Sequence, residues 1–216
     1  ENVLLEHRYK LMGILNGIDY EYYNPSEDKE INRNYTWRSA ARKVENKLAL
    51  QREVGLIERA DVPLVSIISR LVSHKGIDLV AEMVYNLLEN NDVQLVVLGL
   101  GEAKYEQLFV DLADRFKGRV AALIKYDRDT SKRIYSASDI FLMPSKSEPC
   151  GLSQMIASRY GAIPVVRETG GLADSIKGFW LNGETICGNG FTFANYSAGE
   201  LYERTVAAIE LFNNQP

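Results

Sequence analysis

The sequence predicts an α/β protein built on a doubly wound, parallel β-sheet of the Rossmann type. From residue 62 onward, short apolar runs alternate strictly with amphipathic stretches, and the connections between them are short. The first run, residues 62–68, is apolar almost throughout, as expected for a parallel strand that is covered on both faces. This alternation indicates parallel strands joined by helical crossovers.

The first 30 residues differ from this pattern because they are rich in turns. Asn16-Gly17 and Asn24-Pro25-Ser26 are typical turn sequences, and several tyrosines lie between them. We therefore expect residues 1–30 to be a linker segment that leads into the protein, and residues 31–216 to form the α/β domain.

The other elements follow from the spacing of apolar residues. A first helix is expected where such residues recur at helical spacing before a glycine, at Trp37, Ala41, Val44, Leu48 and Gly55. Further helices are expected at residues 77–88, 103–116, 131–137, 152–160 and 198–211. Strands are expected at residues 62–68, 94–98, 120–124, 140–143, 163–166 and 191–193.

Ligands of doubly wound sheets bind at the carboxyl ends of the strands, near the point where the strand order reverses. This rule selects the loops in which to look for chemistry. These loops are residues 69–76, 99–102, 125–129, 145–153 and 168–174.

The composition is that of an ordinary globular protein. Of 216 residues, 46% are apolar and 25% are charged, and the net charge of −4 disfavours nucleic acid or an anionic membrane as a partner. Two cysteines are too few for a disulfide scaffold, no paired His or Cys spacing indicates a metal site, and no apolar run is as long as a membrane span. We therefore expect the protein to reside in a reducing cytosol. Because the chain does not begin with Met, we also expect it to be part of a longer protein.

The loop at residues 69–76 carries two cations, Arg70 at a strand end and Lys75 at a helix start. Together they can neutralise a diphosphate, whereas the alternative is a pair of solvated surface charges. Their place at the carboxyl edge of the sheet favours the ligand role. His74, on the same loop, is interpreted as a bystander.

Two further loops offer weaker signals. Gly99 and Gly101 follow the second strand, where glycine lets a backbone approach a ligand closely, but a plain strand-to-helix turn is equally consistent. They do not belong to a G-x-G-x-x-G fingerprint, because position 104 is Lys. Tyr126, after the third strand, can stack on a nucleobase or cap the core, and the sequence leaves both interpretations open.

The segment from residue 145 to residue 173 is the most informative. Glu148 precedes Pro149, so its backbone is extended and its carboxylate is directed into a loop, where it can accept hydrogen bonds from sugar hydroxyls. A small-residue turn follows and opens a helix, whose free N–H groups attract phosphate. This turn consists of Gly151, Leu152 and Ser153.

A second glycine-containing turn, Thr169-Gly170-Gly171-Leu172, closes this segment. It can offer successive backbone N–H groups to a phosphate or a sugar hydroxyl, or it can be a simple tight turn. Phosphate and sugar recognition side by side indicate a nucleotide-sugar site. Cys150 lies in the first turn, without a catalytic His–Asp partner evident in the sequence, and is interpreted as a turn residue.

Together these stretches resemble the C-terminal domain of bacterial glycogen synthases and plant starch synthases. Glu148 to Gln154, followed by Tyr160-Gly161 and Thr169 to Asp174, is specific to that family, and the similarity covers nearly the whole chain. The other matching stretches are Gly13 to Asp19, Glu45 to Lys47, Ser69 to Leu71, His74 to Leu79 and Leu98 to Gly101.

The resemblance implies a retaining glucosyltransferase of the GT-B fold. Such enzymes move glucose from ADP-glucose to the non-reducing end of an α-1,4-glucan, without a metal or other cofactor, in the cytoplasm or in the plastid of a plant. By resemblance, Arg70 and Lys75 neutralise the donor diphosphate and Glu148 holds the transferred glucose. Tyr126 stacks on adenine, and Ser153 and its neighbours in the turn meet the distal phosphate.

The same resemblance implies that half of the enzyme is missing. The family's N-terminal domain carries a Lys-x-Gly-Gly-Leu motif that this chain lacks, and the helix that crosses back to that domain is expected beyond Leu211. Ile156 stands where related transferases carry a second Glu, so their paired-Glu pattern is incomplete.

Three other functions stay open. They are a transferase that uses a UDP- or GDP-sugar, a nucleotide-binding module without transfer activity, and a nicotinamide-dependent dehydrogenase.

Overall fold

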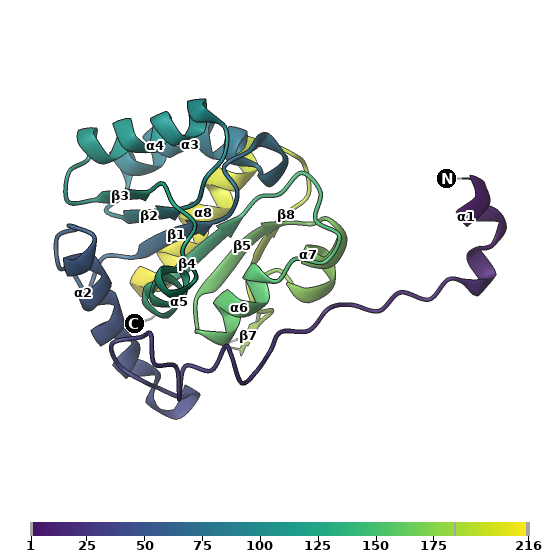
Figure 1. Cartoon of the computed structure of the whole chain (residues 1–216), viewed down its shortest axis with the longest axis horizontal. Helices are drawn as coiled ribbons and strands as arrows, with labels where there is room; N and C mark the ends of the chain where they lie inside the picture. The colour runs from purple at the N-terminus through teal and green to yellow at the C-terminus, as the bar shows by residue number, and fades with distance from the viewer. Residues whose placement is uncertain (1, 184, 215–216) are drawn as a thin grey trace.

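The computed structural model describes residues 2–183 and 185–214. Residues 1, 184, 215 and 216 belong to the predicted ranges but lie outside this description. A sheet of six parallel strands forms the centre of the molecule, in the order β3-β2-β1-β4-β5-β8 (Figure 1). The strands are β1 (Leu64–Ile68), β2 (Gln94–Leu98), β3 (Val120–Leu123), β4 (Ile140–Met143), β5 (Ile163–Arg167) and β8 (Phe191–Phe193).

The strand order confirms the predicted doubly wound sheet. The chain builds outward from β1 to β2 and β3, then returns to place β4 on the other side of β1. The strand order therefore reverses between β1 and β4, and the loops that follow these two strands are where a ligand is expected.

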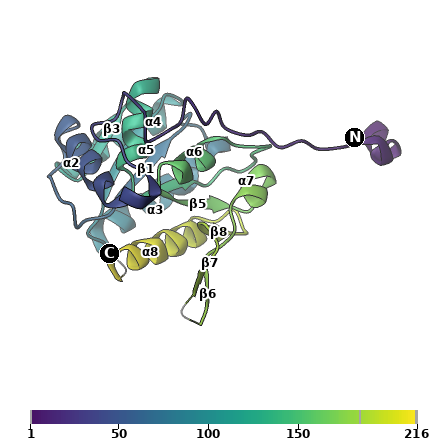
Figure 2. The same ribbon diagram turned by 90° about the horizontal axis from the view of Figure 1, so that it is seen from below.

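Helices cover both faces of the sheet (Figures 1 and 2). The larger apolar cluster packs one face of the strands against α3 (Ile77–Asn90), α4 (Ala103–Arg115) and α8 (Ala198–Asn214). On the opposite face lie α2 (Lys43–Glu53), α5 (Arg128–Ala137) and α6 (Ser153–Arg159). None of the described helices is both long and apolar enough to cross a bilayer.

The helix expected around residues 37–48 is present, but the face assigned to it is wrong. Residues Trp37–Arg42 form a 3-10 helix, η2, and α2 follows. Trp37 is 82% exposed and Val44 is also exposed, whereas α2 buries a mostly polar face. The residues of this face are Asn46, Lys47, Leu50 and Gln51.

Specific partners make this polar face possible. The Lys47 ammonium lies 2.6 Å from the Asp139 carboxylate, and the Gln51 amide donates to Gln94 at 2.6 Å. Buried polar groups are tolerated when they are paired in this way. Because this buried face of α2 is mostly polar, the spacing of apolar residues does not reveal it.

Some elements were not expected from the sequence. Residues 169–172, interpreted as a glycine-containing turn, lead into a short helix, α7 (Gly170–Ser175). An antiparallel hairpin of β6 (Trp180–Asn182) and β7 (Thr185–Cys187) projects from the body of the protein (Figure 2).

The first 35 residues divide into two parts. Residues 2–17, which include α1 (Asn2–Glu6), are exposed and extend away from the sheet (Figure 1). By contrast, Asp28 is buried, accepts a hydrogen bond from the Tyr160 hydroxyl, and lies 3.4 Å from the Lys132 ammonium. The predicted boundary near residue 30 stays a prediction, but contacts cross it.

Candidate nucleotide-sugar site

The structure brings Lys75 and Glu148 together where the strand order reverses. The Lys75 Nζ atom lies 2.5 Å from Glu148 Oε2, and the two side chains are only 19% and 10% exposed. The Ser145 hydroxyl donates to the same carboxylate oxygen at 3.3 Å. A cation and a carboxylate predicted separately from the sequence therefore form one ion pair.

The loops that carry this pair are fixed to each other. Lys75 ends the short 3-10 helix η3 (Ser73–Lys75), and Gly76 follows with φ of 78°. A Cβ atom at Gly76 would lie 2.1 Å from the Pro144 carbonyl oxygen. In addition, the Lys146 N–H donates to the His74 carbonyl at 3.0 Å. The close approach of these backbones requires glycine at position 76.

Backbone contacts with α7 hold the loop that carries Glu148. The Gly171 N–H donates to the Glu148 carbonyl at 3.0 Å, and a Cβ atom at Gly171 would lie 2.1 Å from the Cys150 carbonyl oxygen. The Leu172 N–H donates to the Thr169 carbonyl at 3.0 Å. These two N–H groups, expected to meet a ligand, instead have protein acceptors, while Gly170 passes close to the Glu148 carbonyl.

The turn at residues 151–153 opens α6 as predicted. Gly151 has φ of 70°, Leu152 is exposed, and Ser153 is the first helical residue. Within the described residues, no hydrogen bond uses the N–H groups of Ser153, Gln154 and Met155. The start of α6 therefore keeps N–H groups with partial positive charge and no acceptor in the described part of the chain.

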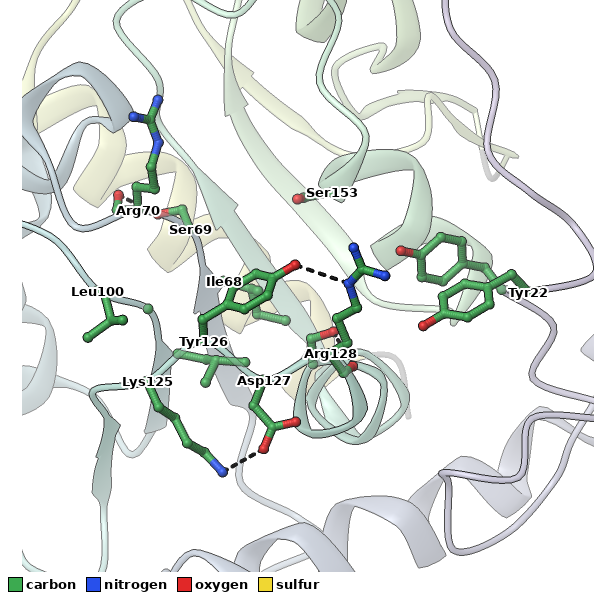
Figure 3. A pocket seen from close by; sticks show the side chains of 14 residues that line it. Tyr22, Ile68, Ser69, Arg70, Leu100, Lys125, Tyr126, Asp127, Arg128 and Ser153 are labelled. Carbon is green, nitrogen blue, oxygen red and sulfur yellow. Dashed lines mark hydrogen bonds and ion pairs between the residues drawn. The ribbon is translucent and has the colours of Figure 1, made fainter.

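A pocket of about 580 Å³ lies at the same edge of the sheet (Figure 3). Its lining comes from the carboxyl ends of β1, β2 and β3, from the start of α5, and from Ser153. A smaller cavity of about 90 Å³ includes Lys75 and Ser145 and shares Ile68, Ser69 and Ser153 with the large pocket. The two cavities therefore lie side by side as one hollowed region, and Lys75 of the ion pair lines its smaller part.

The predicted site residues take different places around this hollow. Arg70, Tyr126, Gly99 and Ser153 line the large pocket, and Lys75 lines the small one. The other predicted residues are not among the linings of these two cavities. They are Glu148, Gly101, Gly151, Leu152 and the residues 169–172.

The structure gives the two glycines after β2 a packing role. A Cβ atom would lie 1.9 Å from the Ser69 carbonyl oxygen at Gly99 and 2.0 Å from the Leu71 carbonyl oxygen at Gly101. The Gly101 N–H donates to the Glu106 carboxylate at 2.7 Å. Both glycines let the loops after β1 and β2 touch, which favours the turn interpretation, and their contact with a ligand stays a prediction.

Several lining residues were not singled out from the sequence, and Arg128, Tyr22 and Tyr23 are among them. Arg128 lies between Tyr126 and Tyr22, and its Nε donates to the Tyr126 hydroxyl at 3.1 Å (Figure 3). This hydrogen bond raises the pKa of the Arg128 guanidinium. Tyr22 and Tyr23 reach the pocket from the turn-rich N-terminal segment. The sequence shows tyrosines in that segment, but it does not indicate that the segment folds back onto the sheet.

The pocket is cationic although the whole chain is acidic. Arg70, Lys125 and Arg128 line it, and Lys125 lies 2.8 Å from Asp127. The Lys125 ammonium and the Thr130 N–H hold the pKa of Asp127 well below its usual range. Among the described residues, no carboxylate pairs with Arg70 or Arg128, so both guanidinium groups can meet an anion.

These features suit a ligand that joins an aromatic base, a diphosphate and a sugar. Tyr126, which is 77% exposed, presents a ring to the base, and the cations and helix start are placed for the diphosphate. The Glu148 carboxylate, which pairs with Lys75, can accept hydrogen bonds from sugar hydroxyls. No cluster of three or more metal-binding side chains occurs in the described parts of the chain.

Comparison with known proteins agrees with this chemistry. The family profile of the group 1 glycosyl transferases matches residues 54–211. A glycogen synthase from Kosmotoga olearia is 52% identical over 206 residues, which are 95% of this chain and 42% of that protein. A glycogen synthase from Clostridium perfringens is 48% identical over 215 residues, which are 100% of this chain and 44% of that protein.

A solved structure is also similar. The catalytic domain of starch synthase IV from Arabidopsis thaliana, bound to ADP and acarbose, matches with a TM-score of 0.89 and 38% identity, over 99% of this chain and 44% of that one. The chain thus spans less than half the length of these relatives. Since the matched family profile contains every strand of the central sheet and both loops of the ion pair, the chain belongs to the group 1 glycosyl transferases.

Proposed function

We propose that this chain is the donor-binding half of a glycogen or starch synthase. The enzyme would be a retaining glucosyltransferase that moves glucose from ADP-glucose to the non-reducing end of an α-1,4-glucan. The observation that carries the proposal is the Lys75–Glu148 pair, whose Lys75 lines a small cavity next to the cationic pocket that Tyr126 lines. The glycogen synthase and starch synthase relatives support the same donor and acceptor.

Each group has a distinct role in this reaction. The bond between glucosyl C1 and the distal phosphate oxygen breaks, and C1 forms a bond to an acceptor hydroxyl, which loses its proton. Arg70 and Lys75 offset the negative charge that develops on the departing ADP. Glu148 holds the glucose through its hydroxyls, the start of α6 receives the distal phosphate, and Tyr126 stacks on adenine.

The acceptor requires a second domain. The chain accounts for only 42–44% of the similar synthases, so we propose that the remaining wall of the active-site cleft belongs to an N-terminal domain of the same enzyme. Without that wall, the glucan is not positioned and water is not excluded. The compartment proposed for the enzyme is the cytoplasm.

Calorimetric titration of the chain with ADP-glucose, UDP-glucose and NAD tests the proposal. We expect weak binding of ADP-glucose, weaker binding of UDP-glucose and none of NAD. A preference for UDP-glucose would favour a transferase with a different donor, and binding of NAD would favour a dehydrogenase. The purified chain should not elongate glycogen, and measurable elongation would contradict the role of a missing domain.

A further inference from the structure

Arg167 ends β5 and binds the loop that follows the neighbouring strand, β4. Its Nε donates to the Ser145 carbonyl at 3.1 Å, and its Nη2 donates to the Lys146 carbonyl. Its Nη1 donates to the Ala194 carbonyl at 3.4 Å, directly after β8. One guanidinium group therefore joins the chain after β4 to the chain after β8. Arginine suits this task because its planar fork presents several N–H donors in fixed directions, which lysine does not.

The two residues that Arg167 binds after β4 contact both members of the Lys75–Glu148 pair. Ser145 is fully buried, and its hydroxyl donates to the Glu148 carboxylate at 3.3 Å. The Lys146 N–H donates at 3.0 Å to the carbonyl of the residue that precedes Lys75. A shift of the backbone at residues 145–146 would therefore disturb the groups that orient the pair.

Tyr196, in the segment between β8 and α8, supports Arg167 and holds the other loop of the pair. Its hydroxyl donates to the Asp78 carboxylate at 2.5 Å and lies 2.9 Å from the Ser73 carbonyl oxygen. Ser73 begins η3, the short helix that Lys75 ends. The Arg167 guanidinium lies 5.7 Å from the centre of the Tyr196 ring, within the range of a cation–π contact. The guanidinium is thus held in place by a ring that is itself anchored to η3.

These contacts indicate that Arg167 orients other groups and does not itself bind the donor. Each of its three side-chain nitrogen atoms donates to a backbone carbonyl of this chain. Neither Arg167 nor Tyr196 is among the described residues that line the large pocket or the small cavity. Orientation matters to an enzyme because a misplacement of about 1 Å, caused far from the reacting atoms, can lower a rate by roughly 10²-fold.

We infer that Arg167 is a positioning residue for glucosyl transfer. Through two backbone carbonyls it fixes the loop whose Ser145 hydroxyl orients the Glu148 carboxylate. The inference rests on the proposed function, in which Glu148 holds the transferred glucose. Loss of the Arg167 contacts should lower kcat more than donor affinity, because the groups proposed for the base and for most of the diphosphate charge lie on other loops.

The test compares Arg167→Lys with a matched control, Arg119→Lys, in the full-length enzyme. Arg119 lies directly before β3, at the opposite end of the sheet. Its Nη2 donates to the Asn91 and Val93 carbonyls at 2.7 and 3.2 Å. Its guanidinium lies 5.8 Å from the centre of the Phe116 ring. Both substitutions therefore keep a positive charge and remove the same kinds of contact, but only one of them disturbs the loop of the ion pair.

We expect Arg167→Lys to lower kcat with ADP-glucose and a glucan primer about tenfold, and to leave ADP affinity within about twofold. Retained ADP affinity also shows that the variant is folded. Arg119→Lys should keep the kcat of the unmodified enzyme. A purely structural role for Arg167 would instead lower the melting temperatures of the two variants alike and leave both kcat values unchanged.

Combination with Glu148→Gln shows whether Arg167 acts through Glu148. The double variant should lose no more than about threefold in kcat beyond Glu148→Gln alone, because the carboxylate that Arg167 orients is already changed. A further tenfold loss would show that Arg167 acts on something else and would contradict the inference.

The same measurements separate this inference from the proposed function. If the unmodified enzyme is active and Arg167→Lys keeps its kcat, or if Arg119→Lys loses as much, Arg167 is not a positioning residue and the proposed function stands. If the unmodified enzyme transfers no glucose from ADP-glucose to a glucan, the proposed function fails and this inference fails with it.

Discussion

The Lys75–Glu148 pair means that each charge has a partner before a donor binds. A half-buried ammonium and a buried carboxylate 2.5 Å apart neutralise each other, so the buried carboxylate is not left unpaired. A donor diphosphate must then share Lys75 with Glu148. The carboxylate therefore works against phosphate binding and in favour of the sugar hydroxyls.

A Glu148→Gln substitution separates these two effects. The amide keeps the shape and one acceptor but removes the charge, so Lys75 becomes fully available to the diphosphate. We expect ADP affinity, measured by calorimetry, to be unchanged or a few-fold higher. In the full-length enzyme, kcat with a glucan primer should fall by about tenfold or more, because a hydrogen bond to a charged group contributes roughly 1.5–3 kcal/mol. If ADP affinity falls together with kcat, Glu148 supports the phosphate and not the sugar.

Tyr126 offers a second test at this scale, because its ring and its hydroxyl have different partners. The ring is exposed to the pocket, whereas the hydroxyl accepts from Arg128. Tyr126→Ala should weaken ADP binding about fivefold, at the lower end of the roughly 1–3 kcal/mol for stacking of a base on an aromatic ring. Tyr126→Phe should bind ADP within about twofold of the unmodified chain. Equal losses in the two variants would assign the affinity to the hydroxyl and Arg128.

Prediction from sequence succeeded for residues whose position follows from the fold class. Arg70 and Tyr126 closely follow strands, and Lys75 lies in the loop between a strand and the next helix, so the alternation of strands and helices was enough to place them at one edge of the sheet. Tyr22 and Tyr23 line the same pocket but belong to a segment without periodicity. Their position depends on tertiary contacts, which no local pattern encodes.

At the scale of elements, α7 shows how a short helix can serve the neighbouring loop. The sequence left a ligand-facing turn and a simple tight turn open for its two glycines. In the structure they bring the backbone of α7 against residues 148–150, and their contact with a ligand stays a prediction. Side chains at these positions would collide with carbonyl oxygens. Glycine pairs have the same sequence whether they meet a ligand or another backbone, so this distinction could not be predicted.

A Gly171→Ala substitution tests that role. The added Cβ atom would lie 2.1 Å from the Cys150 carbonyl oxygen, so the loop that holds Glu148 must move. We expect the free energy of unfolding to fall by roughly 1–3 kcal/mol, as for other overpacked sites. Thermal denaturation measures the effect. Gly17→Ala is the control, because a Cβ atom there has no neighbour within 4 Å and stability should not change. Equal melting temperatures for the two variants would show that α7 does not constrain the loop.

For the whole molecule, the parallel sheet was predictable because its strands are buried on both faces and therefore appear as apolar runs. The limits of the domain were harder to predict. Turn-rich sequence placed the boundary near residue 30, but only residues 2–17 are uniformly free of buried contacts with the rest of the chain, whereas Asp28 is buried against Lys132 and Tyr160. Composition describes a segment's local flexibility and not the contacts it makes.

Two truncations distinguish the predicted boundary from the observed contacts. Deletion of residues 1–16 should leave the melting temperature within about 2 °C, because residues 2–16 are exposed. Deletion of residues 1–30 removes Asp28 and leaves the Lys132 ammonium, with a side chain only 9% exposed, without its counter-charge. An uncompensated buried charge costs about 3–5 kcal/mol, and each kcal/mol lowers the melting temperature of a protein of this size by roughly 2–4 °C. We therefore expect the longer deletion to melt about 10 °C lower, and Asp28→Asn in the full chain to reproduce part of the loss. If both truncated proteins melt at the same temperature, residue 30 is a true domain edge and the Asp28 contacts add nothing to stability.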